Sequence, residues 1–382
     1  MSSYPPPPST NVDWNAFGIE FLEVNGHVES TYSKATGCWS PLRFVPDNYM
    51  RVHGMAPGLN YGQQVLEGLK AYRGRDNGAI SVFRPDAHAR RMQHSAKVVS
   101  IPPVPEDMFI QACKSAVAYN AAFIPPYESG GCAYVRPLLY GSSPHLMMWA
   151  PDDYTFCVFV VPVGGIPSKA PIKTVIVDEF DRAAPNGTGH AKLGGNYAPV
   201  WQWNATAKSQ GYGMILHMDS AKHEEIDEFS TAGFIGVFSS GNNDTKLVVP
   251  DSKCIIESVT SNTILDIAKS FGWKTERRRI KYSELPEFDE VMAAGTYFSL
   301  VPIRSITRPV GRGNLPDSSK VSTAEGAETI SYAADADDVG GPVFQKLLER
   351  IRGIQRLDLD DEFGWRFSAT EEDLSKCPEA RQ

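Results

Sequence analysis

A polar joint near the middle of the chain constrains the fold more than any other feature. The nearly continuous apolar run Tyr154–Val163 ends at the loose sequence GGIPSKAP, and after one short strand-like stretch the polar sequence DEFDRAAPNGTG follows. Segments of this kind, which carry Gly and Pro between apolar regions, commonly separate domains. A chain of 382 residues is also long enough for two domains, each with its own core.

We therefore predict four parts along the chain. They are a flexible N-terminal arm at 1–14, a small α/β domain at 15–178, an interdomain connection at 179–191 and a large domain at 192–382. The arm carries four consecutive prolines and too little apolar surface to fold alone. Because clefts between domains commonly hold ligands, we expect ligand binding close to residue 192.

Apolar periodicity predicts mixed helices and strands on both sides of the joint. Helices are predicted at 87–99, 105–121, 197–209, 262–271 and 343–354. Strands are predicted at 17–28, 80–83, 132–140, 154–163, 173–177, 213–218, 234–238, 274–280 and 290–294. The segment 311–338 is rich in Gly, Ser, Ala and Asp and is predicted to be an exposed loop. The predicted fold class is mixed α/β.

Charge and composition exclude several classes of function. The net charge is −8 and no basic cluster occurs, so no nucleic acid is expected as a partner. No window is long and apolar enough to span a membrane, and the first residues lack the features of a secretory signal or transit peptide, which predicts a cytoplasmic protein. Six dispersed cysteines and eight histidines show no metal-ligand spacing, so no metal site is predicted.

One lysine lies in an unusual environment. Lys192 is part of NGTGHAKLGGNYAPV, where small residues let a ligand or the backbone approach its amine closely. Desolvation disfavours the charged form of an amine, and a neutral amine can attack a carbonyl to form a Schiff base. Taken alone, the same stretch also fits a glycine-rich connection with an incidental lysine. The neighbouring motifs decide between these two interpretations.

Five separated motifs occur in an order and spacing that resemble one known family. They are YGQQVLEGLKAYR at 61–73, FRPDAHARRMQHSA at 83–96, YVRPLLYG at 134–141, KLGGNYAP at 192–199 and the pair GT at 295–296. Together they resemble the branched-chain aminotransferases, which belong to the fold type IV group of pyridoxal-phosphate enzymes. The resemblance implies a two-domain fold with the active site between the domains, pyridoxal 5′-phosphate as cofactor, and a homodimer.

The resemblance also implies contacts with the cofactor. Lys192 would be the catalytic lysine, which binds the cofactor covalently and moves a proton between substrate and cofactor. Glu228 would pair with the pyridine nitrogen, and Tyr197 would hydrogen-bond the ring oxygen. The phosphate contacts would come from Arg91, the amide of Val259, Thr260 and Thr296. An alternative role for Thr260 is the N-cap of the following helix.

Contacts with the substrate are implied in the same way. Tyr134 and Arg136 would lie near the substrate, with the Arg136 guanidinium facing the distal carboxylate of glutamate or 2-oxoglutarate. Phe21, Tyr61 and Leu66 would line a pocket for an apolar side chain. Burying a leucine-sized group there would contribute on the order of 1.5–3 kcal/mol.

Three positions near the implied substrate pocket depart from the family pattern. Leu66 replaces the usual phenylalanine and widens the pocket, while Tyr297 and Phe298 stand where the family has a small turn. If Tyr297, also a candidate substrate contact, pointed inward, the preferred substrate would not be valine, leucine or isoleucine. These departures leave the cofactor chemistry intact and bear on specificity.

The predicted activity is that of an aminotransferase, an enzyme whose partners are small amino and 2-oxo acids. It would move an amino group between an L-amino acid, branched-chain or otherwise apolar, and 2-oxoglutarate by a ping-pong mechanism. Alternatives of the same fold are a D-amino acid or (R)-amine aminotransferase and a lyase acting on an aminodeoxychorismate-like substrate. A non-catalytic pyridoxal-phosphate-binding protein is disfavoured, because binding alone requires no proton-moving lysine.

Overall fold

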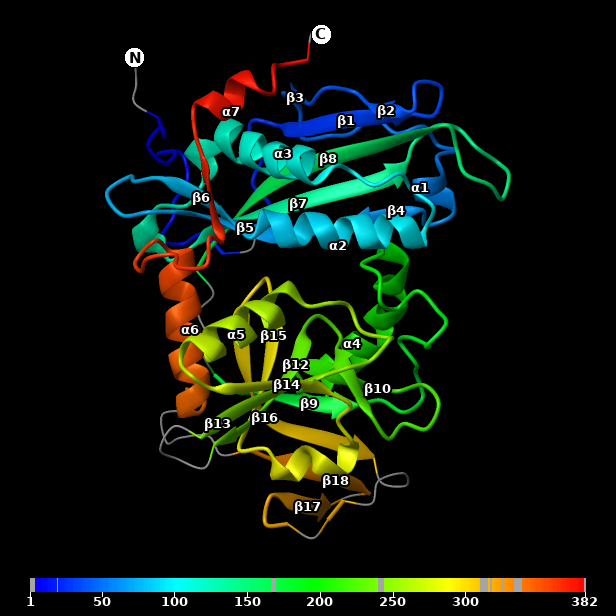
Figure 1. Ribbon diagram of the computed structural model, residues 1–382, viewed down its shortest axis with the longest axis vertical. Coiled ribbons are helices and arrows are strands. Elements are labelled where there is room, and N and C mark those ends of the chain that lie inside the picture. Colours follow the sequence, from blue (N-terminus) through cyan, green and yellow to red (C-terminus); the bar gives the residue numbers. More distant parts are fainter. Residues whose placement is uncertain are drawn as a thin grey trace. The chain divides into compact units, whose positions relative to one another are not determined.

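The computed structural model describes residues 4–18, 20–165, 170–239, 244–309, 315–316, 318–324, 326–332 and 339–380. Contacts divide the chain into two compact units (Figure 1). The first unit consists of Met1–Ile166, Lys192–Gly195 and Gly353–Gln382, and the second of Pro167–Ala191 and Asn196–Arg352. The domain limits proposed from the sequence, 15–178 and 192–382, stay a prediction.

The first unit is built on a nine-stranded sheet. Its order is β19 (Arg366–Ala369), β6 (Ile80–Phe83), β5 (Leu69–Arg73), β7 (Cys132–Gly141), β8 (Asp153–Val163), β1 (His27–Ser33) and β2 (Cys38–Trp39), with β3 (Arg43–Val45) paired to β1 and β4 (Gln64–Leu66) paired to β7. All of these strand pairs are antiparallel. The pairing of β19 with β6 brings the C-terminal part of the chain back to the first unit.

Two helices of 14 residues pack in the first unit, α2 (Pro85–Val98) and α3 (Glu106–Tyr119), as predicted. Proline at the first turn of α2 is favourable because its missing N–H has no partner there in any case. Met92 of α2 and Phe109 of α3 are fully buried at helical spacing with smaller apolar residues. The same unit also contains the short helices α1 (Pro57–Asn60) and α7 (Glu372–Ser375).

The second unit contains a ten-stranded sheet. Its order is β11 (Ile226–Phe229), β10 (Met214–Met218), β9 (Ile172–Ile176), β16 (Ser299–Pro309), β15 (Glu290–Gly295), β12 (Gly233–Ser239), β13 (Thr245–Pro250) and β14 (Lys274–Arg278), with β18 (Ala327–Ser331) on β16 and β17 (Val321–Ala324) on β18. Parallel pairs join β9 to β10, β9 to β16 and β13 to β14. The mixed α/β fold class is thereby confirmed.

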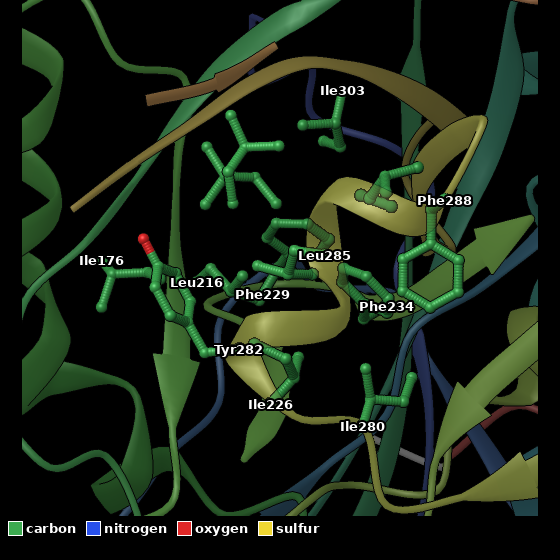
Figure 2. Packing of buried hydrophobic residues seen from close by; sticks show 14 of the residues in the cluster. Ile176, Leu216, Ile226, Phe229, Phe234, Ile280, Tyr282, Leu285, Phe288 and Ile303 are labelled. Carbon is green, nitrogen blue, oxygen red and sulfur yellow. The ribbon is translucent and has the colours of Figure 1, made fainter. Parts of the chain in front are cut away.

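An aromatic core holds the second unit together (Figure 2). Phe229, Phe234 and Phe288 are each at most 1% exposed and pack with Leu216 and Leu285. Burial of side chains of this size contributes on the order of 1.5–3 kcal/mol each. The core therefore fixes the strands β10, β11 and β12, which carry the polar groups described below.

The described residues of the second unit form three α-helices, the last of which ends in the first unit. They are α4 (Trp201–Ser209), which follows the 3-10 turn Ala198–Val200, α5 (Val259–Ser270) and α6 (Pro342–Gln355). The Glu290 carboxylate caps α6 by accepting hydrogen bonds from the backbone N–H groups of Val343 and Phe344, both at 2.9 Å. A carboxylate at a helix N-terminus also complements the helix dipole.

Two predicted segments differ from the structure. The strand predicted at 17–28 is wrong for most of its length, because the backbone N–H groups of Val24 and Asn25 bond to the side chains of Asn48 and Asn120 instead of a neighbouring strand. The loop predicted at 311–338 is wrong for β17 and β18, which form a hairpin that buries Ile330 completely. Residues 311–314, 317, 325 and 333–338 lie outside the described part of the chain.

The described part of the N-terminal arm has no helix or strand but makes hydrogen bonds within the first unit. Arg73 donates to the carbonyl of Pro6 at 3.1 Å, and the N–H of Ser9 donates to the carbonyl of Ala122 at 2.7 Å. Among the described residues, no helix has the length and apolar character needed to cross a bilayer.

Candidate active site

Lys192 is held by its backbone against β4 and α2. Its carbonyl accepts from the N–H of Leu66 at 3.1 Å, and its N–H donates to the buried hydroxyl of Ser95 at 2.9 Å. Gly194, two residues on, lies so close to Gln64 that a Cβ would come within 2.8 Å of the amide nitrogen. The glycine-rich stretch therefore lets the chain run beside β4, with the Lys192 side chain half-buried.

A buried charge cluster lies next to this lysine in the first unit. Glu67 is fully buried and accepts two hydrogen bonds from Arg91, Nε to Oε1 at 2.6 Å and Nη2 to Oε2 at 2.8 Å. His88 Nδ1 lies 2.6 Å from the same carboxylate. Burial alone would raise the pKa of Glu67, but the charges and hydrogen bonds of Arg91 and His88 hold it well below its usual range. Arg91, predicted as a phosphate ligand, is thus oriented by Glu67.

Tyr134 and Arg136 lie on the same face of β7, as their two-residue spacing requires. The guanidinium carbon of Arg136 lies 5.1 Å from the centre of the Tyr134 ring. Arg136 Nε is buried and has no hydrogen-bond partner among the described residues. Gly68 makes room for the tyrosine, because a Cβ there would lie 1.9 Å from the Tyr134 hydroxyl.

The remaining substrate candidates of the first unit differ in exposure. Phe21 is 92% exposed and Tyr61 is 47% exposed, so neither lines a closed pocket within this unit. The Tyr61 hydroxyl donates to the carbonyl of Leu146 at 2.8 Å. Leu66 is half-buried at the end of β4, one residue before Glu67.

Glu228 lies in the second unit, within β11, and is 5% exposed. Its Oε1 pairs with the guanidinium of Arg182 and accepts from the backbone N–H of Ile256 at 3.1 Å. Arg182 is itself fixed by donating to the carbonyl of Cys254 at 2.7 Å and that of Gly189 at 3.2 Å. The carboxylate predicted for the pyridine nitrogen is therefore buried, paired with a cation and held in one orientation.

A neutral hydrogen-bonded group accompanies the Glu228 pair. His217 Nε2 lies 3.1 Å from the hydroxyl of Ser230, which donates to the side chain of Asn204 at 3.1 Å. Burial first, and then the nearby charge of Arg182, lower the pKa of His217 to about 3. The imidazole is therefore neutral at physiological pH.

The N-terminus of α5 carries the predicted phosphate ligands Val259 and Thr260. Ser258 is the N-cap, since its hydroxyl accepts from the N–H of Ser261 at 3.0 Å, and this excludes the capping role considered for Thr260. Gly233 packs against this turn so closely that a Cβ would lie 2.5 Å from Ser261 Oγ. The first turn of a helix presents unpaired N–H groups and a positive dipole end to an anion.

The other candidates of the second unit lie on short turns. Tyr197 is half-buried and immediately precedes the 3-10 turn Ala198–Val200, and Thr296 follows β15. Tyr297 is 41% exposed, whereas Phe298 packs against the aromatic core. The two bulky residues of this turn therefore point to different environments.

Sequence reasoning missed four residues that orient the candidates: Glu67, His88, Ser95 and Arg182. The first three stand inside quoted motifs, but their partners cannot be read from spacing alone. Arg182 is a lone cation in the acidic joint DEFDRAAP, and that isolation was its signal. Each acts through a buried hydrogen bond or ion pair. A buried polar group costs free energy unless it has such a partner.

The fold and these groups define an enzyme that performs amino-group chemistry with a bound cofactor. The family model described as amino-transferase class IV matches residues 64–306, and the chain belongs to this family. Aminotransferase poxL of Penicillium oxalicum is 48% identical over 360 residues, covering 94% of both chains. Branched-chain amino acid aminotransferase gloG of Glarea lozoyensis is 47% identical, covering 95% of this chain and 97% of its own.

Solved structures show the same fold. The branched-chain aminotransferase of Thermoproteus uzoniensis with norvaline matches with a TM-score of 0.69 and 21% identity, covering 89% of this chain and 99% of that chain. The Escherichia coli branched-chain amino acid aminotransferase matches with a TM-score of 0.67 and 22% identity, covering 91% and 100%. Class IV aminotransferases depend on pyridoxal 5′-phosphate, so this is the cofactor of the chain.

Proposed function

We propose that the enzyme transfers an amino group between an apolar L-amino acid and 2-oxoglutarate by a ping-pong mechanism. The observation that carries the proposal is the buried Arg136 Nε, which has no hydrogen-bond partner among the described residues. A buried guanidinium donor is costly unless a ligand satisfies it, and a carboxylate does so with charge-assisted hydrogen bonds. The name of the relative from Glarea lozoyensis supports a branched-chain amino acid as the other substrate.

The donor chemistry of the second unit fits the cofactor. The capped N-terminus of α5, with Val259 and Thr260, suits a phosphate, and Gly233 keeps side chains away from that turn. The buried Glu228 carboxylate suits a protonated ring nitrogen. We propose that these residues hold the phosphate and the ring, together with Arg91, Tyr197 and Thr296.

Bound pyridoxal 5′-phosphate supplies a carbonyl carbon that accepts amines and a ring that delocalises the electron pair left on the substrate's α-carbon. In the proposed mechanism, Lys192 Nζ takes the proton from the substrate's α-carbon and delivers it to the cofactor carbon that accepts amines. Glu228 holds a proton on the ring nitrogen, and Arg182 keeps the carboxylate ionised and oriented. Arg136 orients the dicarboxylic substrate.

The Lys192 role is tested with purified Lys192→Ala and the exposed-lysine control Lys208→Ala. Borohydride reduction of the wild-type holoenzyme should attach the cofactor to the peptide that contains Lys192, as read by mass spectrometry. L-Leucine and L-glutamate should bleach the visible absorbance of wild type and Lys208→Ala, but not that of Lys192→Ala. Bleaching by D-leucine instead would favour a D-amino acid aminotransferase.

The Arg136 role is tested by comparing two acceptors in Arg136→Met. The KM for 2-oxoglutarate should rise on the order of 10- to 100-fold, the scale of a lost hydrogen bond between charged groups. The KM for 4-methyl-2-oxopentanoate, which has no distal carboxylate, should stay unchanged. Arg43→Met, at an exposed arginine of the same sheet, is the control. Equal changes for both acceptors would contradict the assignment.

We also propose that the enzyme is a homodimer in the cytoplasm. A loop of the first unit exposes Leu146 by 66%, Met148 by 89% and Trp149 by 63%. Clustered apolar side chains of this kind usually mark a protein interface. A reducing compartment agrees with the six cysteines, all of which are free thiols.

A further inference from the structure

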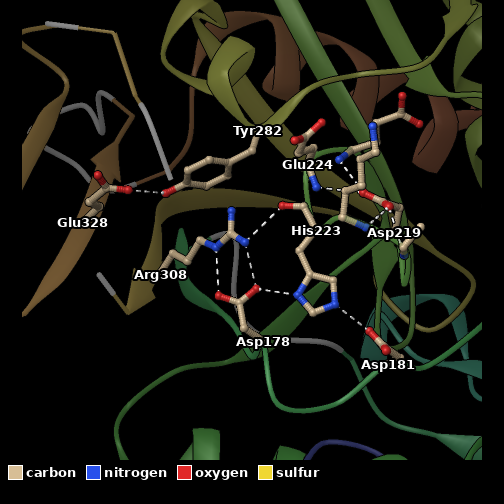
Figure 3. A network of polar contacts seen from close by, with 11 residues as sticks. Asp178, Asp181, Asp219, His223, Glu224, Tyr282, Arg308 and Glu328 are labelled. Atoms are coloured by element: carbon tan, nitrogen blue, oxygen red, sulfur yellow. Dashed lines mark hydrogen bonds and ion pairs between the residues drawn. The ribbon is translucent and has the colours of Figure 1, made fainter. Parts of the chain in front are cut away.

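Four ionisable side chains form a continuous row in the second unit (Figure 3). Arg308 donates to both oxygens of Asp178, with Nε to Oδ2 at 2.9 Å and Nη2 to Oδ1 at 2.8 Å. His223 Nδ1 lies 3.0 Å from Asp178 Oδ1, and His223 Nε2 lies 2.8 Å from Asp181 Oδ1. The mechanism above assigns no role to this row.

Both ring nitrogens of His223 lie within hydrogen-bond distance of a carboxylate oxygen. An ionised carboxylate only accepts hydrogen bonds, so an imidazolium satisfies both contacts at once, whereas a neutral imidazole satisfies one. Burial would raise the pKa of Asp178, but hydrogen bonds and charge pairing with Arg308 and His223 lower it below its usual value. Asp178 is therefore an ionised acceptor at neutral pH.

Other polar groups near the row make contacts of their own. Arg308 Nη2 reaches the carbonyl of His223 at 3.0 Å and not its imidazole. On its other side the Arg308 guanidinium packs over the Tyr282 ring, whose hydroxyl bonds to Glu328 at 3.3 Å. The Asp219 carboxylate accepts four backbone N–H groups of the turn that carries His223, between 2.7 and 3.1 Å.

The backbone at His223 does not itself call for histidine. Its φ is +55°, in the left-handed region that a residue with a Cβ adopts only with strain. Glycine or asparagine would occupy the same turn with less strain. The contacts of the side chain with Asp178 and Asp181 are therefore an argument for histidine at this position.

Asp178 and Asp181 lie just after β9, on the segment that also carries Arg182. His223 holds this segment at two points, and the second point is the neighbour of the arginine that pairs with Glu228. Arg182 is buried, so a small displacement of its backbone would misalign the pair with Glu228.

We propose that His223 is a positioning residue: as an imidazolium it clamps Asp178 and Asp181 and thereby holds Arg182 on Glu228. The inference rests on the proposed role of Glu228 at the cofactor's ring nitrogen. It predicts that losing the His223 side chain weakens cofactor binding and lowers kcat more than it changes the KM for the amino acid.

The test uses His223→Asn and His223→Gly, because both residues tolerate the left-handed backbone. Lys222→Ala is the control, since the substitution keeps the backbone N–H by which Lys222 bonds Asp219. The dissociation constant of pyridoxal 5′-phosphate is measured by fluorescence titration of the apoprotein at neutral pH. Both His223 variants should bind on the order of 10-fold more weakly than wild type and Lys222→Ala.

Turnover kinetics separate positioning from a general loss of stability. The kcat of the His223 variants should fall, with little change in the KM for the amino acid. Asp181→Asn, at a half-exposed position, should reproduce the loss of cofactor affinity. Wild-type affinity in His223→Asn, His223→Gly or Asp181→Asn would overturn the inference.

A further variant distinguishes this inference from the proposed function. Glu228→Gln should weaken cofactor binding and turnover. If Glu228→Gln behaves like wild type, the proposed role of Glu228 is wrong. The positioning role of His223, which acts through Glu228, is then wrong as well. If Glu228→Gln is impaired and the His223 variants are not, the proposed function stands and the clamp is wrong.

Discussion

At the scale of single residues, both units bury a carboxylate and orient it with a guanidinium. Glu67 pairs with Arg91 in the first unit, and Glu228 pairs with Arg182 in the second. Removing one partner of a buried pair costs more than the pair contributes, because the other charge is left without compensation. Such pairs therefore fix orientation in a site where small displacements matter.

The neutral His217 gives a pH dependence of stability with a definite sign. Its pKa in the folded chain, about 3, lies below its ordinary value, so the unfolded chain binds the proton first as the pH falls. The stability from this group is present above pH ~6.5 and is lost as the pH drops from there toward the folded pKa. Between pH ~7.5 and ~5 the loss should be about 2 kcal/mol.

Urea unfolding of apoprotein at these two pH values measures this loss. His217→Gln keeps a hydrogen-bonding group near Ser230 but does not titrate, so its stability should fall by about 2 kcal/mol less than that of wild type. His53→Gln, at an exposed histidine, should retain the wild-type pH dependence. If the free energy of unfolding of His217→Gln fell as much as that of wild type between the two pH values, His217 would not be the group responsible for the loss.

At the scale of elements, α5 combines a structural cap with the proposed phosphate site. The Ser258 hydroxyl caps the helix and orders the turn that carries Val259 and Thr260. The proposed phosphate contact uses the N–H groups of that same turn, so the cap prepares the site.

Ser258→Ala should therefore lower stability and cofactor affinity together. Loss of a serine N-cap costs about 0.5–2 kcal/mol, and we expect several-fold weaker binding of pyridoxal 5′-phosphate. Ser270→Ala, at the other end of α5, removes only a bond to the carbonyl of Ile267 and is the matched control. Calorimetry and fluorescence titration measure the two effects. Equal cofactor affinity in both variants would argue against the phosphate site.

At the scale of the whole molecule, the exposed apolar loop bears on assembly. Leu146, Met148 and Trp149 follow β7, and the loop is tied to Tyr61 by a hydrogen bond to the Leu146 carbonyl. Exposing apolar surface of this kind to water costs free energy. Contact with a second copy of the chain would remove that cost.

Two equally large substitutions test the homodimer. Trp149→Glu should weaken the dimer at least 10-fold, because it places a charge in the interface core. Trp201→Glu, at a tryptophan that is 70% exposed on α4, should leave the dimer intact. Sedimentation velocity, which separates one copy of 42.0 kDa from two, measures the outcome. Dimers of wild-type strength in Trp149→Glu would place the interface elsewhere.

Local periodicity was sufficient to predict most of the regular elements. Helices α2, α3, α5 and α6 and the buried strands β7 and β8 lie within a few residues of their predicted limits. Side chains three or four residues apart meet on a helix whatever its surroundings, so this information is local. The prediction failed at 17–28, where side chains from elsewhere in the chain bond the backbone.

The sequence by itself determined the candidate lysine, from the small residues around it, and the family, from the resemblance of five motifs; the cofactor was implied by that resemblance. Only the tertiary structure decided which charged groups meet: Arg91 with Glu67, Arg182 with Glu228, and His223 with Asp178 and Asp181. The sequence alone does not show which acidic and basic residues of this chain pair with each other. Burial and distance decide this, because burying a charge costs much free energy unless an ion pair compensates it.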